Sequence, residues 1–207
     1  MDRKKLFIVF EGIDGSGKST QMDLLSKRIL EDGNEVITTC EPTILPSGKF
    51  IRDILSANVV LNQATLAALF LADRIEHILH PNDGILDQLK SGNHVISDRY
   101  YFSSLAFQSE YVPMQWIANA NKICKDLLIA DFTFYIQVDP HICFERIKEG
   151  RKHLEIFEHP EKLQLTHEKY LEAFNQYGDG ENIITVDGNR SKEDIHLEIL
   201  SYLNLGV

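Results

Sequence analysis

Short apolar runs recur along the chain, and longer amphipathic stretches separate them. The five runs cover residues Leu6–Phe10, Glu35–Thr39, His94–Ser97, Phe132–Val138 and Ile183–Val186. Their length and their content of β-branched and aromatic residues are typical of buried strands. Because strands that alternate with helices form parallel sheets, the pattern predicts an α/β fold with a five-stranded, mostly parallel sheet and helices on both faces.

The stretches between these runs predict helices. The first helix begins in a glycine-rich segment and extends to about Asp32, and a second covers about Gln63–His80 and ends before Pro81. Residues Ser191–Asp194 have the pattern of a capping box that opens the last helix. With 207 residues and no internal repeat or linker, the chain is predicted to be one domain over residues 1–207.

The segment between Gly150 and Pro160 is the most irregular one between two helices. Its start is basic and its end is acidic. We therefore expect a short mobile lid over about residues 146–160.

The composition argues against several kinds of partner. The formal net charge of −10 opposes nonspecific binding to nucleic acid or to an acidic membrane surface, so an anionic ligand must meet a local basic pocket. The cysteines Cys40, Cys124 and Cys143 are widely spaced, which indicates neither a disulfide framework nor a zinc site. The run Leu6–Phe10 is too short to span a membrane or to form the core of a signal peptide. We expect a soluble, cytoplasmic protein without a nucleic-acid or membrane partner.

Residues Gly12–Ser19 read Gly-Ile-Asp-Gly-Ser-Gly-Lys-Ser and fit the P-loop pattern GxxxxGK[ST]. They follow a predicted strand directly and open a predicted helix, which is the context in which such a loop binds phosphates. Backbone N–H groups of the loop cradle the phosphates of ATP, Lys18 supplies charge for the β- and γ-phosphates, and Ser19 ligates Mg²⁺. The predicted nucleotide-binding residues are Gly12, Gly15, Ser16, Gly17, Lys18, Ser19 and Thr20.

A P-loop indicates a nucleotide and leaves the reaction open. A GTPase would need an NKxD motif to read guanine, and the nearest match is Asn121-Lys-Ile-Cys124, with a cysteine where a carboxylate is required. We interpret it as a chance match on a solvated face of a predicted helix. The absence of this motif favours a kinase over a GTPase switch and leaves a noncatalytic ATP-binding module as an alternative.

A kinase that acts on a phosphorylated acceptor needs a second basic pocket, because both substrates are anions. Asp98-Arg99-Tyr100 follows the strand His94–Ser97, so Arg99 lies at the carboxyl end of a parallel strand, where open sheets bind ligands. Asp98 is also a candidate to orient the Mg²⁺ shell through water. The alternative for Arg99 is a structural salt bridge with Asp98 or another neighbour.

Four motifs stand in the order and at the spacing of the thymidylate kinase family, which the chain resembles over about residues 6–175. They are Phe10–Thr20, then Glu41-Pro42 with Gly48 and Arg52, then Leu69–Arg74, then Asp98–Tyr100 with Ser103, Ser104, Phe107 and Gln108. The resemblance implies a three-layer P-loop NTPase fold and transfer of the ATP γ-phosphoryl group to dTMP, which gives dTDP and ADP. It also implies Mg²⁺ as cofactor and a homodimer. Another nucleoside or nucleotide kinase, for example one for dUMP, is the nearest alternative enzyme.

The resemblance implies a pocket for the base. Phe70 stacks on thymine and Arg74 donates to a base carbonyl, and their spacing of four residues puts both on one helix face. Core packing is the alternative for Phe70. Ser104 and Gln108 match positions that line the base pocket, although such residues also cap helices or lie in solvent.

The resemblance also implies residues for the sugar and the phosphates. Asp14 meets the 3′-hydroxyl and the reacting phosphates, and Arg52 and Arg99 hold the acceptor phosphate. Phe107 crowds the 2′ carbon and so disfavours ribose. The family often has tyrosine at this position, and phenylalanine keeps the bulk of that side chain but loses its hydroxyl.

The chain departs from the family in two loops. Cys40–Leu45 stands where the family commonly reads Arg-Glu-Pro-Gly-Gly-Thr, which predicts a reshaped loop with a retained role. The P-loop has Gly15 after Asp14, so the lid should supply the cation for the transferred phosphoryl group. The candidates are Arg146, Lys148, Arg151 and Lys152, of which Arg151 is preferred, and the predicted catalytic set is Lys18, Asp14, Arg99 and Arg151.

Overall fold

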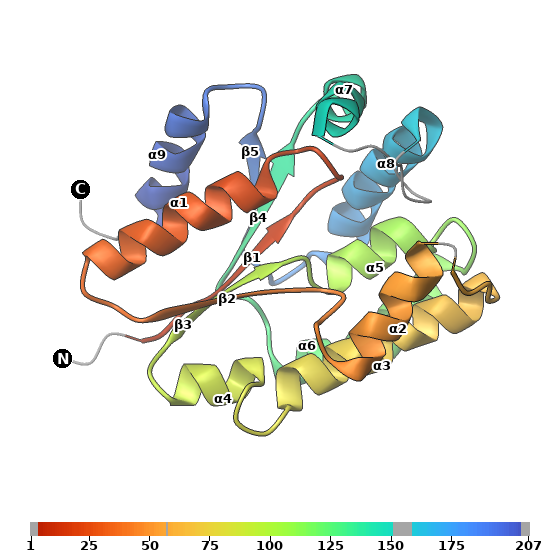
Figure 1. The fold of residues 1–207 in the computed structure, drawn as a ribbon, viewed down its shortest axis with the longest axis horizontal. Coiled ribbons are helices and arrows are strands. Elements are labelled where there is room, and N and C mark those ends of the chain that lie inside the picture. Colours follow the sequence, from red (N-terminus) through yellow and green to blue (C-terminus); the bar gives the residue numbers. More distant parts are fainter. Residues whose placement is uncertain (1–3, 57, 151–158, 204–207) are drawn as a thin grey trace.

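The predicted strands form one sheet in the computed structural model, which describes residues 4–56, 58–150 and 159–203 (Figure 1). The strands are β1 (Phe7–Glu11), β2 (Val36–Cys40), β3 (His94–Asp98), β4 (Phe132–Gln137) and β5 (Ile183–Asp187). Their order within the described residues is β2-β3-β1-β4-β5, and each neighbouring pair there is parallel. The sheet is therefore parallel throughout the described chain, where the sequence predicted a mostly parallel one.

Helices cover both faces of the sheet, with α1 and α9 on one face and α3, α4 and α6 on the other (Figure 1). The helices are α1 (Lys18–Glu31), α2 (Pro46–Leu55), α3 (Gln63–Leu79), α4 (Ile85–Lys90), α5 (Tyr101–Gln108), α6 (Met114–Leu127), α7 (Pro140–Gly150), α8 (Pro160–Tyr177) and α9 (Lys192–Leu203). This three-layer arrangement around a parallel sheet is the P-loop NTPase fold that the sequence predicts.

The register of the three central strands brings distant segments together at one edge of the sheet. Phe10 of β1 lies opposite Asp98 of β3 and opposite Phe134 of β4. Because the strands are parallel, the loop after β1 and the residue after β3 leave the sheet side by side. Asp14 and Arg99 follow these strand ends, so the sheet itself positions both residues at its carboxyl edge.

Aromatic packing fixes two helices beside this edge. Phe102 of α5 packs on Phe174 of α8 with ring centroids 4.9 Å apart, and Tyr135 of β4 packs on Tyr170 and Phe174 at 5.2 and 5.0 Å. Leu163 and Tyr170 of α8 are fully buried in the same packing. The contacts hold α5 and α8 rigidly next to the strands that carry the site.

Local signals at the helix ends agree with the sequence. The Oγ atom of Ser191 accepts from the backbone N–H of Asp194 at 3.1 Å and donates to its carboxylate at 2.6 Å, at the start of α9. The predicted helix over 63–80 is α3, whose first turn is capped by Asn62 through the N–H of Ala64 at 2.8 Å. In the described part of the chain, no helix is both long and apolar enough to cross a membrane.

Candidate active site

The loop between β1 and α1 is closed by its own lysine. Nζ of Lys18 donates to the carbonyl oxygens of Gly12 at 3.0 Å and Ile13 at 3.2 Å. Burial lowers the pKa of Lys18 and the nearby Arg99 cation lowers it further, although Asp98 raises it. A buried cation with only carbonyl and distant carboxylate partners is well placed to attract a phosphate.

Helix α7 packs directly against this loop. A Cβ atom on Gly15 would lie 2.5 Å from the carbonyl oxygen of Cys143, and the φ angle of Gly15 is +79°, so the position requires glycine. Nη1 of Arg146, also on α7, donates to the carbonyl of Gly15 at 3.3 Å. The P-loop and the base of the predicted lid are therefore in contact.

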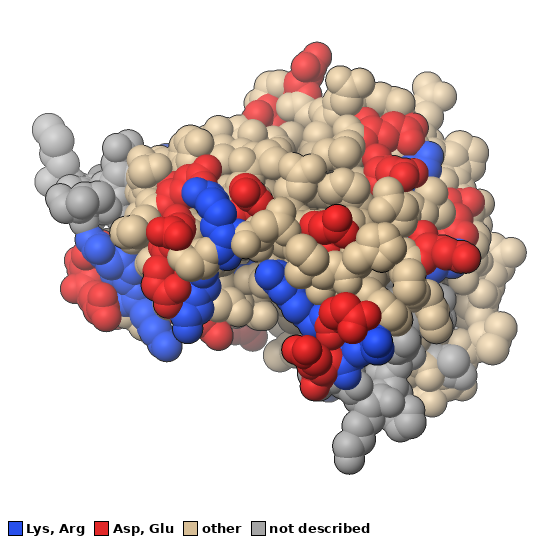
Figure 2. Space-filling model, turned by 90° about the horizontal axis from the view of Figure 1, so that it is seen from above, with Lys and Arg blue, Asp and Glu red and all other residues tan. Residues whose placement is uncertain are grey.

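The chain carries local positive charge at the P-loop although its net charge is negative. Among the described residues, the cations that line the cavity around the loop are Lys18, Arg146, Arg190 and Lys192. On the face seen in Figure 2, most Lys and Arg side chains lie in two groups, each mixed with acidic side chains. This face therefore has no continuous basic surface, and an anion would meet the local pocket instead.

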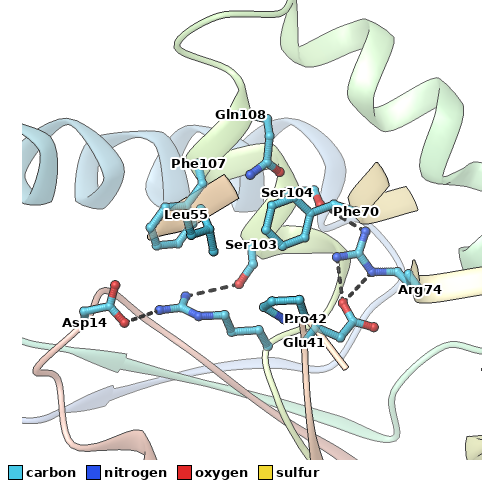
Figure 3. A pocket seen from close by; sticks show the side chains of 11 residues that line it. Asp14, Glu41, Pro42, Leu55, Phe70, Arg74, Ser103, Ser104, Phe107 and Gln108 are labelled. Atoms are coloured by element: carbon cyan, nitrogen blue, oxygen red, sulfur yellow. Dashed lines mark hydrogen bonds and ion pairs between the residues drawn. The ribbon is translucent and has the colours of Figure 1, made fainter. Parts of the chain in front are cut away.

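A second cavity lies beside the P-loop and contains most of the predicted acceptor residues (Figure 3). It is lined by Asp14, Glu41, Pro42, Leu55, Phe70, Arg74, Arg99, Ser103, Ser104, Phe107 and Gln108. Phe107 and Leu55 lie with Asp14 toward one end, and Phe70, Arg74 and Glu41 lie toward the other (Figure 3). Asp14 lines this cavity and the P-loop cavity alike, so the two cavities meet at its side chain.

Arg99 is held at this junction by several acceptors. Nη2 donates to Oδ1 of Asp14 at 2.7 Å, and Nη1 donates to the carbonyl of Gly12 and the hydroxyl of Tyr170, both at 3.0 Å. Its guanidinium carbon lies 4.6 Å from the ring centre of Phe107. Burial alone would lower the pKa of Arg99, but the Asp14 carboxylate holds it above its ordinary value. The ion pair of Arg99 is thus with Asp14, whereas the sequence had offered Asp98 as the alternative.

Arg99 also has an unusual backbone. Its φ angle is +75°, in the left-handed region that residues with a side chain rarely adopt. Such strain persists only where neighbouring contacts enforce it, and it is commonest at functional sites.

Glu11 is a site residue that the sequence reasoning missed. It is fully buried, and its Oε1 accepts from the backbone N–H groups of Tyr100 at 2.9 Å and Ser103 at 3.2 Å. Its Oε2 accepts from the hydroxyls of Ser103 at 2.5 Å and Tyr170 at 2.9 Å. Burial raises the pKa of Glu11, and the Ser103 hydroxyl and the Arg99 cation oppose that rise. The carboxylate therefore anchors the start of α5 and the partners of Arg99. A glutamate at the end of an otherwise apolar strand is the signal that could have revealed it.

Arg74 lies at the other end of the cavity and is almost fully buried. It pairs with Glu41 at 2.7 Å and donates from Nη1 to the hydroxyl of Ser104 at 3.0 Å and to Oδ1 of Asn121 at 2.5 Å. The interpretation of Asn121 as part of a solvated helix face was wrong, because its side chain is only 5% exposed. A buried guanidinium needs acceptors on every side, and Asn121 supplies one of them.

Ser104 and Gln108 do not lie in solvent. Each is 3% exposed and both line the cavity. Oε1 of Gln108 has no hydrogen-bond partner among the described residues, which leaves an acceptor beside the cavity wall. Phe70 is half-buried and packs on the cluster formed by Ile51, Ile54 and Leu66 between α2 and α3.

One predicted residue, Arg52, lies outside the lining of the acceptor cavity. The guanidinium of Arg52 donates to the carbonyl oxygens of Pro42 and Thr43, and it is not among the described residues that line the acceptor cavity. It thereby holds the loop after β2, which Asp73 also fixes by accepting from the N–H and hydroxyl of Thr43 at 2.7 and 2.6 Å. Arg151 and most of the predicted lid lie outside the described residues.

The parallel sheet, the P-loop after its first strand and the second arginine-lined cavity define a P-loop nucleotide-binding protein built for two anionic ligands. A family model described as thymidylate kinase matches residues 10–199. The chain is 40% identical over 200 residues to a protein of Methanocaldococcus jannaschii named probable thymidylate kinase, with 96% of this chain and 95% of that protein covered. It is 34% identical over 203 residues to a thymidylate kinase of Leptospira interrogans, which covers 96% and 94% of the two chains. The thymidylate kinase of Halothermothrix orenii is 34% identical over 197 residues, with 94% of each chain covered. The chain therefore belongs to the thymidylate kinase family.

Proposed function

We propose that the chain is an ATP-dependent dTMP kinase, which transfers the γ-phosphoryl group of ATP to dTMP and releases ADP and dTDP. Membership of the thymidylate kinase family supports this reaction. The observation that carries it for this chain is that Asp14 lines both the P-loop cavity and the acceptor cavity. Phosphates bound in the two cavities would meet beside this residue.

The P-loop is the proposed donor site. Lys18 bonds only backbone carbonyls in the described structure, and we expect it to turn to the β- and γ-phosphates of ATP, where its charge is better matched. The other proposed contacts come from the loop and the start of α1, namely Gly12, Gly15, Ser16, Gly17, Ser19 and Thr20.

Ser19 and Asp98 are the proposed protein contacts of Mg²⁺. Oδ1 of Asp98 is buried without a hydrogen-bond partner in the described chain, and it lies 3.9 Å from Nζ of Lys18. These hard oxygen atoms fit a metal that prefers to take its remaining ligands from water and substrate phosphates. The described residues contain no group of three or more His, Cys, Asp or Glu side chains that could hold a metal. Mg²⁺ bound there supplies positive charge that screens the phosphates.

The base of dTMP is proposed to lie at the end of the acceptor cavity that holds Phe70 and Arg74. A half-buried aromatic ring offers a stacking surface, and Nη1 of the buried guanidinium donates to the Ser104 hydroxyl at the cavity, where a base carbonyl can share or replace that bond. Ser104 and Gln108 add a hydroxyl and an amide beside them. This set matches the polar edge of a pyrimidine better than it matches a purely apolar ligand.

The sugar and the phosphate are proposed to lie toward Phe107 and Arg99. Phe107 fills space near the sugar and would disfavour a 2′-hydroxyl. Arg99 gives a fork of donors for the phosphate, and Asp14 accepts from one of them and faces the junction. Arg52 remains a predicted second phosphate contact, which would require it to leave the carbonyls that it now bonds.

The chemistry of transfer then needs alignment more than proton transfer. The acceptor phosphate is already an anion at neutral pH, so one of its oxygens attacks the γ-phosphorus directly while the bond to the β,γ-bridging oxygen breaks and ADP leaves. Arg99 fixes the nucleophile, and Lys18 stabilises charge on the transferred group. Arg151 of the lid is proposed as a further cation at this group.

The assembly and location of the chain remain predictions from its sequence and family. We propose a single-domain homodimer in the cytoplasm. Light scattering of the purified chain tests the dimer, and cell fractionation tests the location.

An acceptor panel tests the proposed function. Formation of ADP and of each phosphorylated product is measured with ATP and Mg²⁺ and with dTMP, dUMP, TMP, dCMP or thymidine. We expect dTMP to have the highest kcat/KM and thymidine to give no dTMP. If ATP binds but no acceptor is phosphorylated, the chain is a noncatalytic ATP-binding module, and if thymidine is the preferred acceptor it is a nucleoside kinase.

A further inference from the structure

The guanidinium of Arg74 has no donor left over within the described part of the chain. A guanidinium carries five N–H donors. Nε donates to Oε2 of Glu41 at 2.8 Å, Nη1 donates to Ser104 and Asn121, and Nη2 contacts Glu41 at 2.7 Å and the carbonyl of Tyr100 at 3.1 Å. A side chain that is held by this many acceptors has one orientation, and the residues that supply the acceptors determine that orientation.

Glu41 is itself held by His77, through the carboxylate oxygen that does not contact Arg74. Oε1 of Glu41 lies 3.1 Å from Nδ1 of His77, and Nε2 of His77 lies 2.7 Å from the hydroxyl of Thr39. A carboxylate only accepts, so Nδ1 must carry a proton, and in the neutral ring Nε2 then accepts from Thr39. These hydrogen bonds connect Glu41, through His77, to Thr39 of strand β2.

Asn121 fixes the opposite side of Arg74. Its Nδ2 donates to the carbonyl of Ile117 one turn earlier in α6 at 2.9 Å, which turns its Oδ1 toward Arg74. Because the amide donor already has a partner, the oxygen cannot exchange places with the nitrogen without the loss of both bonds.

We propose that His77 and Asn121 are positioning residues for base recognition, which act through Arg74 and not by contact with the substrate. Among the described residues that line the acceptor cavity, neither His77 nor Asn121 is present, whereas Arg74, Glu41 and Ser104 are. The inference rests on the proposed function, because it assigns the base end of the same cavity.

The physical consequence is selectivity between a carbonyl and an amino group on the base. Ser104 lines the cavity, so its hydroxyl is the partner of Nη1 that a base carbonyl can replace or share. A cytosine amino group at the same place would bring its own N–H donors against the N–H donors of a fixed cation, which is costly in a buried site. If Arg74 is loosened, its donors can turn away and the penalty for cytosine falls.

The test compares Asn121→Ala with the unmodified chain. We expect the KM for dTMP to rise about tenfold, kcat to change less than about twofold, and the preference for dTMP over dCMP in kcat/KM to fall about tenfold. The matched control is Lys122→Ala on the same helix, because Lys122 is exposed and pairs only with Asp126 at 2.6 Å among the contacts described. It should leave all three quantities unchanged.

A second comparison separates action through Arg74 from an independent effect. In an Arg74→Gln background, the addition of Asn121→Ala should not reduce the base preference further. An equal reduction in both backgrounds would overturn the proposal.

Thr39→Val tests the other side of the network if Asn121→Ala does not fold. The change keeps the side-chain shape on a half-buried strand and removes only the hydroxyl that holds His77. We expect a fall of about threefold in base preference. An unchanged preference in folded Thr39→Val, or in folded Asn121→Ala, contradicts the proposal while dTMP phosphorylation by the unmodified chain still stands. Failure of the unmodified chain to phosphorylate any monophosphate would instead remove the proposed function.

Discussion

At the scale of single residues, the site depends on charges that are buried with their partners. Glu11 accepts from the hydroxyls of Ser103 and Tyr170, and Arg99 donates to the same two hydroxyls. Neither charge would be tolerated alone in this interior, because an unpaired buried charge is strongly destabilising. The proposed catalytic arginine is therefore positioned by a carboxylate that need not touch a substrate.

Replacement of Arg99 by lysine tests the need for a fork of donors. Arg99→Lys keeps the charge but loses the planar fork that bonds Asp14, Gly12 and Tyr170 together, so we expect kcat/KM for dTMP to fall about 100-fold. Steady-state kinetics measure the change. Arg28→Lys is the control, because Arg28 pairs with Asp32 on the surface of α1, and a similar loss there would show that the effect is not specific.

Asp98 gives a prediction about the metal. Asp98→Asn removes the charge of a carboxylate whose Oδ1 has no hydrogen-bond partner among the described residues. We expect the Mg²⁺ concentration for half-maximal activity to rise about tenfold, and a chelator to abolish the activity of the unmodified chain. A titration with Mg²⁺ measures both, and an unchanged requirement would exclude Asp98 from the metal site.

The sequence predicted site residues with local motifs and missed those defined by distant contacts. Lys18, Ser19 and Asp14 lie in one loop whose pattern carries its own chemistry. The roles of Glu11 and Asn121 arise from partners more than 40 residues away, although Glu11 itself lies beside the P-loop. Only the folded chain brings these partners together.

At the scale of elements, the strands were predictable because each is apolar and short. The observed bounds of β1 differ by one residue from the predicted run Leu6–Phe10, and those of β2 differ similarly. Helix α5 gave no periodic signal, because all of its residues from Tyr101 to Gln108 are buried and no polar face exists. That residues 101–108 form a helix is therefore visible only in the folded chain and not in the hydrophobic pattern of the sequence.

The contact between the P-loop and α7 gives a prediction at this scale. Gly15→Ala places a Cβ 2.5 Å from the carbonyl oxygen of Cys143, so loop and helix must separate. We expect a loss of about 2–3 kcal/mol in the free energy of unfolding and weaker ATP binding. Denaturant unfolding and calorimetry measure these effects.

Gly33→Ala is the matched control for backbone strain. Gly33 has a similar φ angle of +75°, but a Cβ there would meet nothing within 4 Å. It should cost about 1 kcal/mol and leave ATP binding unchanged. Equal effects of the two substitutions would show that backbone strain alone, and not contact with α7, explains the Gly15 position.

At the scale of the whole molecule, the parallel topology collects the site from segments far apart in sequence. The residues after β1 and β3 come together only because these strands are neighbours in the order β2-β3-β1-β4-β5. Alternation of strands and helices predicted a parallel sheet, but many strand orders satisfy that pattern. The order itself was not predicted, and it emerges from the pairing of the folded strands.

Stability of the whole fold should depend on pH through three histidines that are buried or half-buried. Burial lowers the pKa of His94, His167 and His196 below its ordinary value. On acidification the unfolded chain binds these protons first, so the free energy of unfolding should fall as the pH drops below about 6.5. Nδ1 of His94 accepts from the N–H of Leu6 at 3.1 Å, and only an unprotonated Nδ1 can do so.

Thermal unfolding between pH 7 and pH 5 measures this dependence. His94→Gln should flatten part of it, whereas His141→Gln, at an exposed position, should not. A stability that rises as the pH falls through this range would contradict the assignment.

Transfer of a label from ATP tests directly whether the chain moves the γ-phosphoryl group to dTMP. The chain is incubated with ATP labelled at the γ-phosphate, Mg²⁺ and dTMP, and the labelled products are separated. We expect the label to appear in dTDP at the same rate as ADP forms. Label found only in inorganic phosphate would contradict it, because the two cavities that meet at Asp14 would then not serve a donor and an acceptor.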